Sequence, residues 1–287
     1  MGILNRLKGK QSSKKSKNRL PEKSFQPLQA RLMYKELPNL NKEELRLELG
    51  KLFNSIVEKD VKKNHYAYTF PEKQIEHNGE DLDAQIQVFL PEKENFIGVH
   101  PQVSQQSWYF PKNQILLSQC THELLISDFP YNGIDYGTRL EVFNNFLLAF
   151  IKVTKPLVLF SIPGQKVLGP RHITGCLDKE SFNPLFTCIN LRTYNVKENQ
   201  EDEESEVLFD TIGLNSFGLD DFQIQSYGLD SNKISEILWK CAVESIQGKT
   251  LENGDTVSGM DNDIHWTCKR VKSTIPPERT VIELIQS

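Results

Sequence analysis

Apolar residues recur at helical spacing in three parts of the chain. The first part follows a capping box that begins at Asn41, and it predicts a helix over 41–59. The second and densest part predicts a buried helix over 136–154 that stops before Pro156. The third part predicts a helix capped by Asp230.

Alternating or wholly apolar runs predict strands between and after these helices. They cover residues 28–36, 84–90, 122–129, 157–162, 186–196, 207–214, 222–227, 264–269 and 280–285. Residues 105–119 are expected to hold a short helix interrupted at Pro111.

This order of elements predicts an α+β fold with mixed sheets and packed helices. The order β-α-(β)-β-α-β over 28–129 fits a ferredoxin-like arrangement with a split βαβ unit. We expect a flexible or amphipathic basic tail over 1–24 and α+β halves over 25–135 and 136–287. The two halves form either a tandem of similar units or one continuous globular unit.

Charge divides the chain into a basic start and an acidic remainder. Residues 1–23 carry eight basic side chains and one acid, hence +7, whereas the whole chain has −4, so the rest sums to −4 − 7 = −11. An acidic body argues against specific nucleic-acid binding. Ile3, Leu4 and Leu7 share one face of a basic segment, so residues 1–19 either contact an anionic membrane weakly or are unstructured.

The number of cysteines and the length of the longest apolar run indicate the cellular compartment of the protein. Five cysteines are present, an odd number without a Cys-x-x-Cys pair, which favours reduced thiols in a cytoplasm. The longest apolar run, 146–151, is far shorter than the roughly 18 residues of a spanning helix. We therefore expect a cytoplasmic protein.

The candidate catalytic residues lie around one predicted strand. Cys120 and His122 are two positions apart and would share a face there, so His122 could activate the thiol. Asp128 at the far end of the strand and Asp210 complete the set of weak catalytic candidates. The alternative is that His122 is a hydrogen-bonded histidine at the start of a strand.

Metal and phosphate motifs are incomplete. His172 with Cys176, and His265 with Cys268, offer ligand spacing without a nearby second pair, and no metal or cofactor is predicted. The glycines after residue 163 lack the spacing of a phosphate-binding loop.

Four further residues are weak candidates for binding. Trp108 and Tyr109 could form an aromatic ledge, although core packing is the alternative interpretation. Asp220 and Asp221 could hold a divalent cation, although two acids in a turn usually cap it in contact with water.

The last third of the chain resembles the bacterial family catalogued as domain of unknown function 4261. The likeness rests on FDTIGLNSFGLDDFQ at 209–223, GLD at 228–230, NGDTV at 253–257, Trp266 with Cys268, and 277–282. A weaker likeness over 28–162 includes Trp108 and His122, whereas the six acids within 198–206 depart from the family. The resemblance implies a bacterial, intracellular α+β protein and carries over no catalytic residues.

Three functional hypotheses follow. The leading one is a non-enzymatic protein-binding module of the immunity or stress-response kind, because no catalytic set converges and the acidic body suits a basic partner. The first alternative is a hydrolase or transferase with a site around His122, Asp128 and Asp210. The second is attachment to a membrane surface through residues 1–19.

Overall fold

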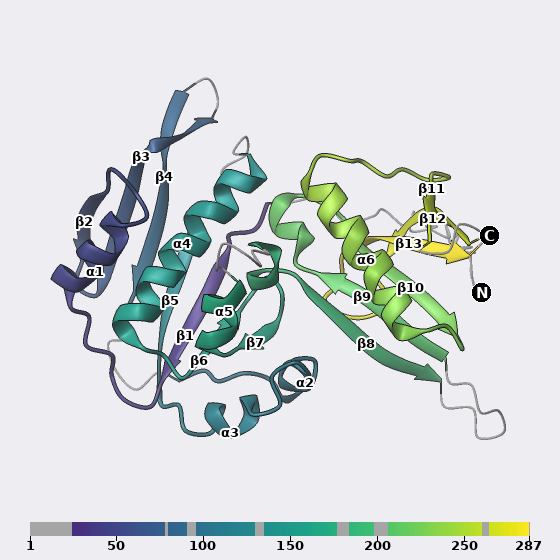
Figure 1. The fold of residues 1–287 in the computed structure, drawn as a ribbon, viewed down its shortest axis with the longest axis horizontal. Helices are drawn as coiled ribbons and strands as arrows, with labels where there is room; N and C mark the ends of the chain where they lie inside the picture. Colours follow the sequence, from purple (N-terminus) through teal and green to yellow (C-terminus); the bar gives the residue numbers. More distant parts are fainter. Residues whose placement is uncertain are drawn as a thin grey trace, which may run out of the picture.

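The computed structural model describes residues 25–77, 80–90, 96–129, 135–176, 184–197, 206–259 and 264–286, which form two β-sheets with helices packed against them (Figure 1). The α+β class predicted from the pattern is therefore confirmed. The predicted tail over 1–24 lies outside the described residues.

The first sheet has seven strands in the order β2-β3-β4-β5-β1-β6-β7, and every neighbouring pair is antiparallel. Its strands are β1 (Gln29–Tyr34), β2 (Val57–Lys62), β3 (His65–His77), β4 (Glu80–Phe89), β5 (His122–Asp128), β6 (Val158–Ser161) and β7 (Lys166–Leu168). Its helices are α1 (Lys42–Gly50), α2 (Pro101–Gln105), α3 (Asn113–Leu117), α4 (Tyr136–Thr154) and α5 (Pro170–Cys176).

A split βαβ unit is present, but later than the sequence predicted. A ferredoxin-like sheet over 28–129 would place β1 between β4 and β5, whereas β5 itself lies between β4 and β1. The split unit is instead formed by β5, α4 and β6, with β1 inserted antiparallel between the two strands. The ferredoxin-like expectation for 28–129 is therefore wrong, because β1 pairs with β6 and extends the sheet.

The second sheet has six strands in the order β11-β12-β13-β10-β9-β8. They are β8 (Asn190–Lys197), β9 (Glu206–Ile212), β10 (Asp221–Tyr227), β11 (Thr256–Ser258), β12 (His265–Lys272) and β13 (Thr280–Gln286). β13 runs parallel to β10, and the other pairs are antiparallel. Helix α6 (Ser231–Ile246) lies across one face, and the short turns η1 (Pro184–Thr187) and η2 (Leu214–Phe217) lie near the junction of the sheets.

One large apolar core is continuous from α4 and the first sheet to α6 and the second sheet. A smaller cluster lies on the opposite face of the first sheet, where Met33 and Phe160 pack beneath residues of α2 and α3. Successive side chains of a strand point to opposite faces of the sheet, which explains the two clusters. Leu32 of β1 belongs to the large core, whereas its neighbour Met33 belongs to the smaller cluster. We call residues 96–119 the α2–α3 layer.

The three helices predicted from apolar spacing all begin where the sequence predicted. Helix α4 spans the predicted 136–154, and Lys155 ends it in the left-handed conformation. Asp230 caps α6, since its carboxylate accepts a hydrogen bond from the backbone nitrogen of Asn232 at 2.8 Å. The predicted helix over 41–59 begins correctly but stops at Gly50.

The border between the sheets falls after β7. The strands of the first sheet come from both sides of residue 135, where the sequence analysis placed the border between two halves. In the part of the chain that the structure describes, no helix has the length and apolar content needed to cross a bilayer.

Candidate functional site

Side chains from one short segment, residues 106–109, hydrogen-bond one edge strand of each sheet. β7 is one of the two edge strands of the first sheet. The backbone nitrogen of Val167 in β7 donates to Ser107 Oγ at 2.8 Å, and the Tyr109 hydroxyl donates to the Val167 carbonyl at 3.0 Å. Both edge-facing backbone groups of Val167 are therefore satisfied by side chains.

Gln106 hydrogen-bonds the backbone of β8, one of the two edge strands of the second sheet. Its side-chain nitrogen donates to the Thr193 carbonyl at 2.8 Å, and its side-chain oxygen accepts from the Thr193 backbone nitrogen at 3.1 Å. A primary amide thus takes the place of a neighbouring strand at one position. The segment between α2 and α3 links the two edges and blocks pairing with another chain at these positions.

Buried polar groups hold this segment in place. Asn113, which is buried, donates from Nδ2 to the Phe110 carbonyl at 2.7 Å and to the Ser104 carbonyl at 3.1 Å. Ser107 Oγ also donates to the Val103 carbonyl at 3.1 Å. The turn that carries residues 106–109 is therefore fixed from within.

The structure separates the two aromatic candidates of this segment. Tyr109 is half-buried, packs edge-on against Phe186 with ring centroids 5.5 Å apart, and burial raises its pKa above the usual range. Trp108 projects outward and is 68% exposed. The packing alternative thus describes Tyr109, while Trp108 presents its indole to the surface.

The α2–α3 layer has few charges and several exposed apolar side chains. Ile97 is 82% exposed and Ile115 is 63% exposed. Lys112 is the single Asp, Glu, Lys or Arg residue in 96–119, whereas such residues make up 25% of the chain. Depletion of charge together with exposed aromatic and aliphatic side chains is typical of the centre of a protein–protein interface.

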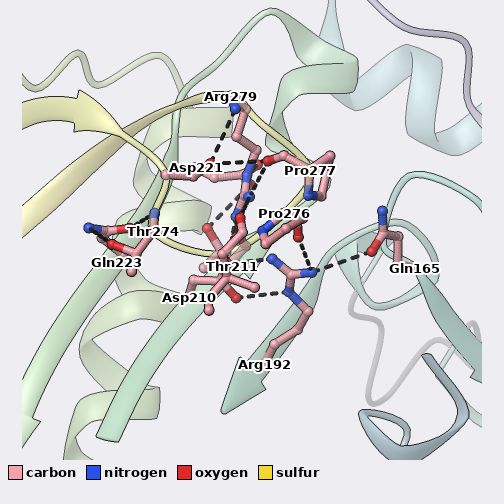
Figure 2. A network of polar contacts seen from close by, with 12 residues as sticks. Gln165, Arg192, Asp210, Thr211, Asp221, Gln223, Thr274, Pro276, Pro277 and Arg279 are labelled. Carbon is pink, nitrogen blue, oxygen red and sulfur yellow. Dashed lines mark hydrogen bonds and ion pairs between the residues drawn. The ribbon is translucent and has the colours of Figure 1, made fainter. Parts of the chain in front are cut away.

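A second arrangement of polar side chains lies inside the second sheet (Figure 2). Asp210 in β9 accepts hydrogen bonds from Arg192 Nε at 2.9 Å and from Arg279 Nη2 at 2.6 Å. Asp221 in β10 accepts from Arg279 Nε at 2.8 Å. All four side chains are buried, and their formal charges sum to zero.

This network reaches the first sheet. Arg192 Nη1 donates to the carbonyl of Pro276 at 3.0 Å and to Gln165 Oε1 at 3.3 Å, as Figure 2 shows. Gln165 lies in the turn between β6 and β7. Arg192 therefore connects β8, on which it lies, with the loop between β12 and β13 and with the turn between β6 and β7 of the other sheet.

Burial and ion pairing shift the pKa values of Asp221 and Arg279 in opposite directions. Burial raises the pKa of Asp221 to about 6, although Arg279 and the Leu214 backbone nitrogen oppose the rise. Burial also lowers the pKa of Arg279, but Asp221 and Asp210 outweigh it, so that this pKa lies above its usual value. Arg279 therefore stays charged, and the energetic penalty of burial falls on Asp221.

Asp128 forms a comparable pair with Arg139 of α4. Asp128 Oδ2 accepts from Arg139 Nε at 2.6 Å, and Oδ1 accepts from the Leu28 backbone nitrogen at 2.6 Å. Burial raises the pKa of Asp128 against the effect of Arg139. Arg139 also donates to the carbonyls of Ser216 and Gln26, so this pair too joins the two sheets.

The predicted catalytic residues do not come together. His122 and Asp128 occupy opposite ends of β5, about 20 Å apart at the usual rise of a strand, and Asp210 lies in the other sheet. His122 Nδ1 lies 2.8 Å from Thr121 Oγ1. The Cys120 thiol donates to the Leu116 carbonyl at 3.3 Å, and burial raises its pKa to about 11.

The two neighbouring acids Asp220 and Asp221 point to different arginines. Asp220 Oδ2 lies 2.8 Å from Arg270 Nη2, whereas Asp221 pairs with Arg279. Their carboxylates therefore neutralise separate cations in place of sharing one.

Metal-ligand spacing does not become a metal centre in the described ranges, where no three His, Cys, Asp or Glu side chains converge. His172 Nδ1 accepts a hydrogen bond from the Gly169 nitrogen at 3.2 Å, and Cys268 is buried. The side chain of Cys176 and the acidic residues 198–205 lie outside the described part.

A cleft lies at the junction between the sheets, with an empty volume of about 510 Å³ that opens to solvent. Its wall includes Gln165, Asn215 and Ser216. Each arginine network has a member or a hydrogen-bond partner in this wall, because Gln165 contacts Arg192 and Ser216 contacts Arg139. Arg192 and Arg139 thus lie behind the wall of the cleft, where they contact Gln165 and Ser216, and aspartates balance their charges.

The sequence analysis missed the arginines of these networks, although it contained a signal for one of them. Arg192 is the single charged residue in the predicted strand 186–196, and Asp210 is the single charged residue in 207–214. Two lone opposite charges in neighbouring strands favour a cross-strand pair, and in the structure the two residues lie directly opposite each other.

The chain was compared with protein families, curated proteins and solved structures. Neither a curated protein nor a solved structure matched the chain. The resemblance noted in the last third of the sequence is confirmed there: residues 210–285, which contain Asp210, Asp221 and Arg279, match the family described as Domain of unknown function (DUF4261).

Proposed function

We propose that this protein is a binding protein that contacts another protein through the α2–α3 layer, with Trp108 at the centre of the contact. The observation that carries the proposal is the exposed indole of Trp108 on a segment anchored at both ends. Tryptophan is among the side chains that contribute most to binding energy at protein interfaces.

The anchoring supports this role because it lowers the entropy lost on binding. Gln106 is fixed by Thr193 on one side of Trp108, and Tyr109 is fixed by Val167 on the other. A side chain presented by an ordered backbone needs little further ordering when a partner arrives.

Composition indicates the kind of partner. The exposed side chains of Ile97, Trp108 and Ile115 offer apolar area, and Lys112 is the single charged neighbour within 96–119. The complementary surface is therefore an apolar patch on another protein with few charged residues at its centre. Whether the complex serves immunity or a stress response depends on the identity of that protein.

Site-specific crosslinking tests the proposal. Replacing Ile115 with the photo-crosslinking residue p-benzoylphenylalanine, in the native host, identifies proteins at the layer; the same replacement at Leu47 is the control, because Leu47 is 70% exposed on α1. The captured partner is then purified, and its affinity is measured for the wild type, Trp108→Ala and Leu47→Ala.

We expect an adduct from position 115 that position 47 does not give. Trp108→Ala should weaken the affinity about 30-fold or more, as for an interface residue worth at least about 2 kcal/mol, and Leu47→Ala should leave it within about twofold. Equal effects of the two variants would contradict the proposal, as would an adduct made solely of two copies of this chain.

A further inference from the structure

The wall of the cleft between the two sheets carries no formal charge. Among the described residues that form it, none is Asp, Glu, Lys or Arg. The two arginines behind the wall are each balanced by an aspartate. A charged ligand would lose hydration in the cleft without gaining a counter-ion, so the cleft suits an uncharged molecule.

The cleft has room for a molecule of about one ring. Its volume is about 190 Å³ once open solvent is left out, whereas drug-sized ligands occupy pockets of about 300–1,000 Å³. Ile162 and Pro163 contribute apolar groups from the side of the first sheet, and Ile212 and Pro277 contribute them from the side of the second. A planar ring between these side chains would contact apolar groups of both sheets.

Gln165 offers a hydrogen-bond donor whose orientation is fixed. A guanidinium group can only donate, so the side-chain oxygen of Gln165 faces Arg192, and Figure 2 shows the amide nitrogen directed away from Arg192. In the part of the chain that the structure describes, this nitrogen has no acceptor. The backbone of Gln165 is left-handed, with φ of 44°, which is uncommon for a residue with a side chain. The turn therefore holds an unused N–H donor at the wall of the cleft.

Asn215 of η2 offers a donor and an acceptor side by side. Its side-chain amide lines the cleft and has no hydrogen-bond partner among the described residues. The backbone around it is fixed by Gly213 and Gly218, which are both left-handed, and a Cβ atom on Gly213 would collide with the Cys188 carbonyl. A carboxamide pairs best with a ligand that carries an N–H group next to a C=O group.

We propose that this cleft binds a small, uncharged, planar molecule with an imide edge, which is an N–H group between two carbonyl groups, as in the nucleobase uracil. Asn215 pairs with the N–H group and one carbonyl, Gln165 donates to the other carbonyl, and the apolar side chains contact the faces of the ring. None of the described wall residues belongs to the α2–α3 layer, so the site is independent of the proposed protein-binding surface.

Side-chain amide signals in nuclear magnetic resonance spectra test the proposal directly. The full chain is labelled with ¹⁵N, and the signals of Gln165, Asn215 and the exposed Gln102 are assigned through Gln165→Met, Asn215→Asp and Gln102→Met. Uridine is the probe. 3-Methyluridine is the matched probe without the imide hydrogen, and uridine 5′-monophosphate tests the effect of charge.

We expect uridine to shift the Gln165 and Asn215 signals in a saturable manner with a Kd on the order of 1 mM, while the Gln102 signal stays in place. 3-Methyluridine should bind at least about tenfold more weakly, because the Asn215 oxygen loses its donor. Uridine 5′-monophosphate should bind no more tightly than uridine. Asn215→Asp, followed through the Gln165 signal, should weaken binding about tenfold or more, and Gln102→Met should leave the Kd within about twofold.

Four results would overturn the proposal. They are Gln165 and Asn215 signals that uridine leaves unchanged, equal affinity for uridine and 3-methyluridine, tighter binding of the monophosphate, and undiminished binding in folded Asn215→Asp. If Asn215→Asp fails to fold, Gln165→Met provides the same test through the Asn215 signal, and the proposal then requires the same tenfold loss in that variant.

Discussion

The side-chain amide of Gln106 is paired with both backbone polar groups of Thr193, at 2.8 and 3.1 Å. This contact occupies the outer edge of β8 at the position where a further strand would hydrogen-bond. Together with the contacts of Ser107 and Tyr109 to Val167, it places one turn against one edge strand of each sheet. The same turn presents Trp108, so edge protection and the proposed contact surface depend on one segment.

Removal of this amide should open the edge of β8. In Gln106→Ala, water replaces the lost hydrogen bonds because Thr193 is exposed, and we expect the free energy of unfolding to fall by about 1 kcal/mol. The uncovered edge should also promote self-association, which light scattering coupled to size-exclusion chromatography measures. Gln102→Ala on α2 is the control, and equal behaviour of the two variants would contradict this role of Gln106.

The Arg279 pairs should be the most sensitive polar contacts of the second sheet. Arg279→Met leaves Asp221 buried without its cation, and we expect a loss of about 3–5 kcal/mol in urea denaturation. Arg270→Met, at a partly exposed pair with Asp220, should cost about 1 kcal/mol.

A double-mutant cycle separates pairing from packing. The loss in Arg279→Met combined with Asp221→Asn should be smaller than the sum of the single losses, by about 1–3 kcal/mol. Strict additivity of the two substitutions would show that the pair carries no interaction energy.

The raised pKa of Asp221 makes a prediction for pH dependence. Burial holds the folded-state pKa near 6, above the value of an exposed carboxyl in the unfolded chain, so the folded state binds the proton more readily between these values. The stabilisation that comes from protonation is present at low pH and is lost as the pH rises through about 6.

The comparison with Asp221→Asn isolates this effect. Between about pH 7 and pH 5, the unfolding free energy of the wild type should rise by about 1 kcal/mol relative to that of Asp221→Asn. Urea denaturation of both proteins at each pH measures the difference. A difference that stays constant, or that falls toward acidic pH, would contradict the assignment.

The described thiols should be unreactive in the folded protein. Burial raises the pKa of Cys120 to about 11 and those of Cys188 and Cys241 to about 12, and it also raises that of Cys268. In Cys176→Ser, which leaves these four thiols, reaction with a disulfide reagent at about pH 8 should be at least about 100-fold slower than in denaturant. Rapid native modification of Cys120 would revive its role as a nucleophile.

The membrane contact predicted for residues 1–19 remains a prediction of the sequence. If the basic segment binds anionic lipid, the full chain should float with phosphatidylserine-containing vesicles and a variant lacking residues 1–24 should not. Added salt should weaken flotation, because screening shortens the range of the attraction to about 10 Å at 0.1 M. Equal flotation of both proteins would remove this function.

Helices could be predicted where periodic apolar residues meet one buried face, as in α4, whose bounds match the prediction. The prediction for α1 extended too far because Phe53 continues the apolar spacing after the helix has ended. In the structure the Phe53 ring packs on Phe70 of β3, with centroids 4.5 Å apart. A tertiary contact therefore accounts for a residue that local periodicity assigned to the helix.

The missed strands lack the alternation on which strand prediction depends. β2 is an edge strand with mostly exposed side chains, and β3 contains Pro71 within a register shift between Phe70 and Gln74. A proline is tolerated there because the irregular pairing does not need its N–H group. The anchored segment 106–109 could not be predicted from the sequence. The contact between Gln106 and Thr193 joins residues 87 positions apart, and no local pattern indicates it.

The central place of β13 has a consequence for synthesis of the chain. β13 lies between β12 and β10, which are joined to each other through it alone within the second sheet. Until residues 280–286 are available, β10 and β12 present unpaired backbone N–H and C=O groups along the edges that β13 covers. Chains that end before residue 280 therefore carry two open strand edges, and we expect chaperones to bind them and proteases to degrade them.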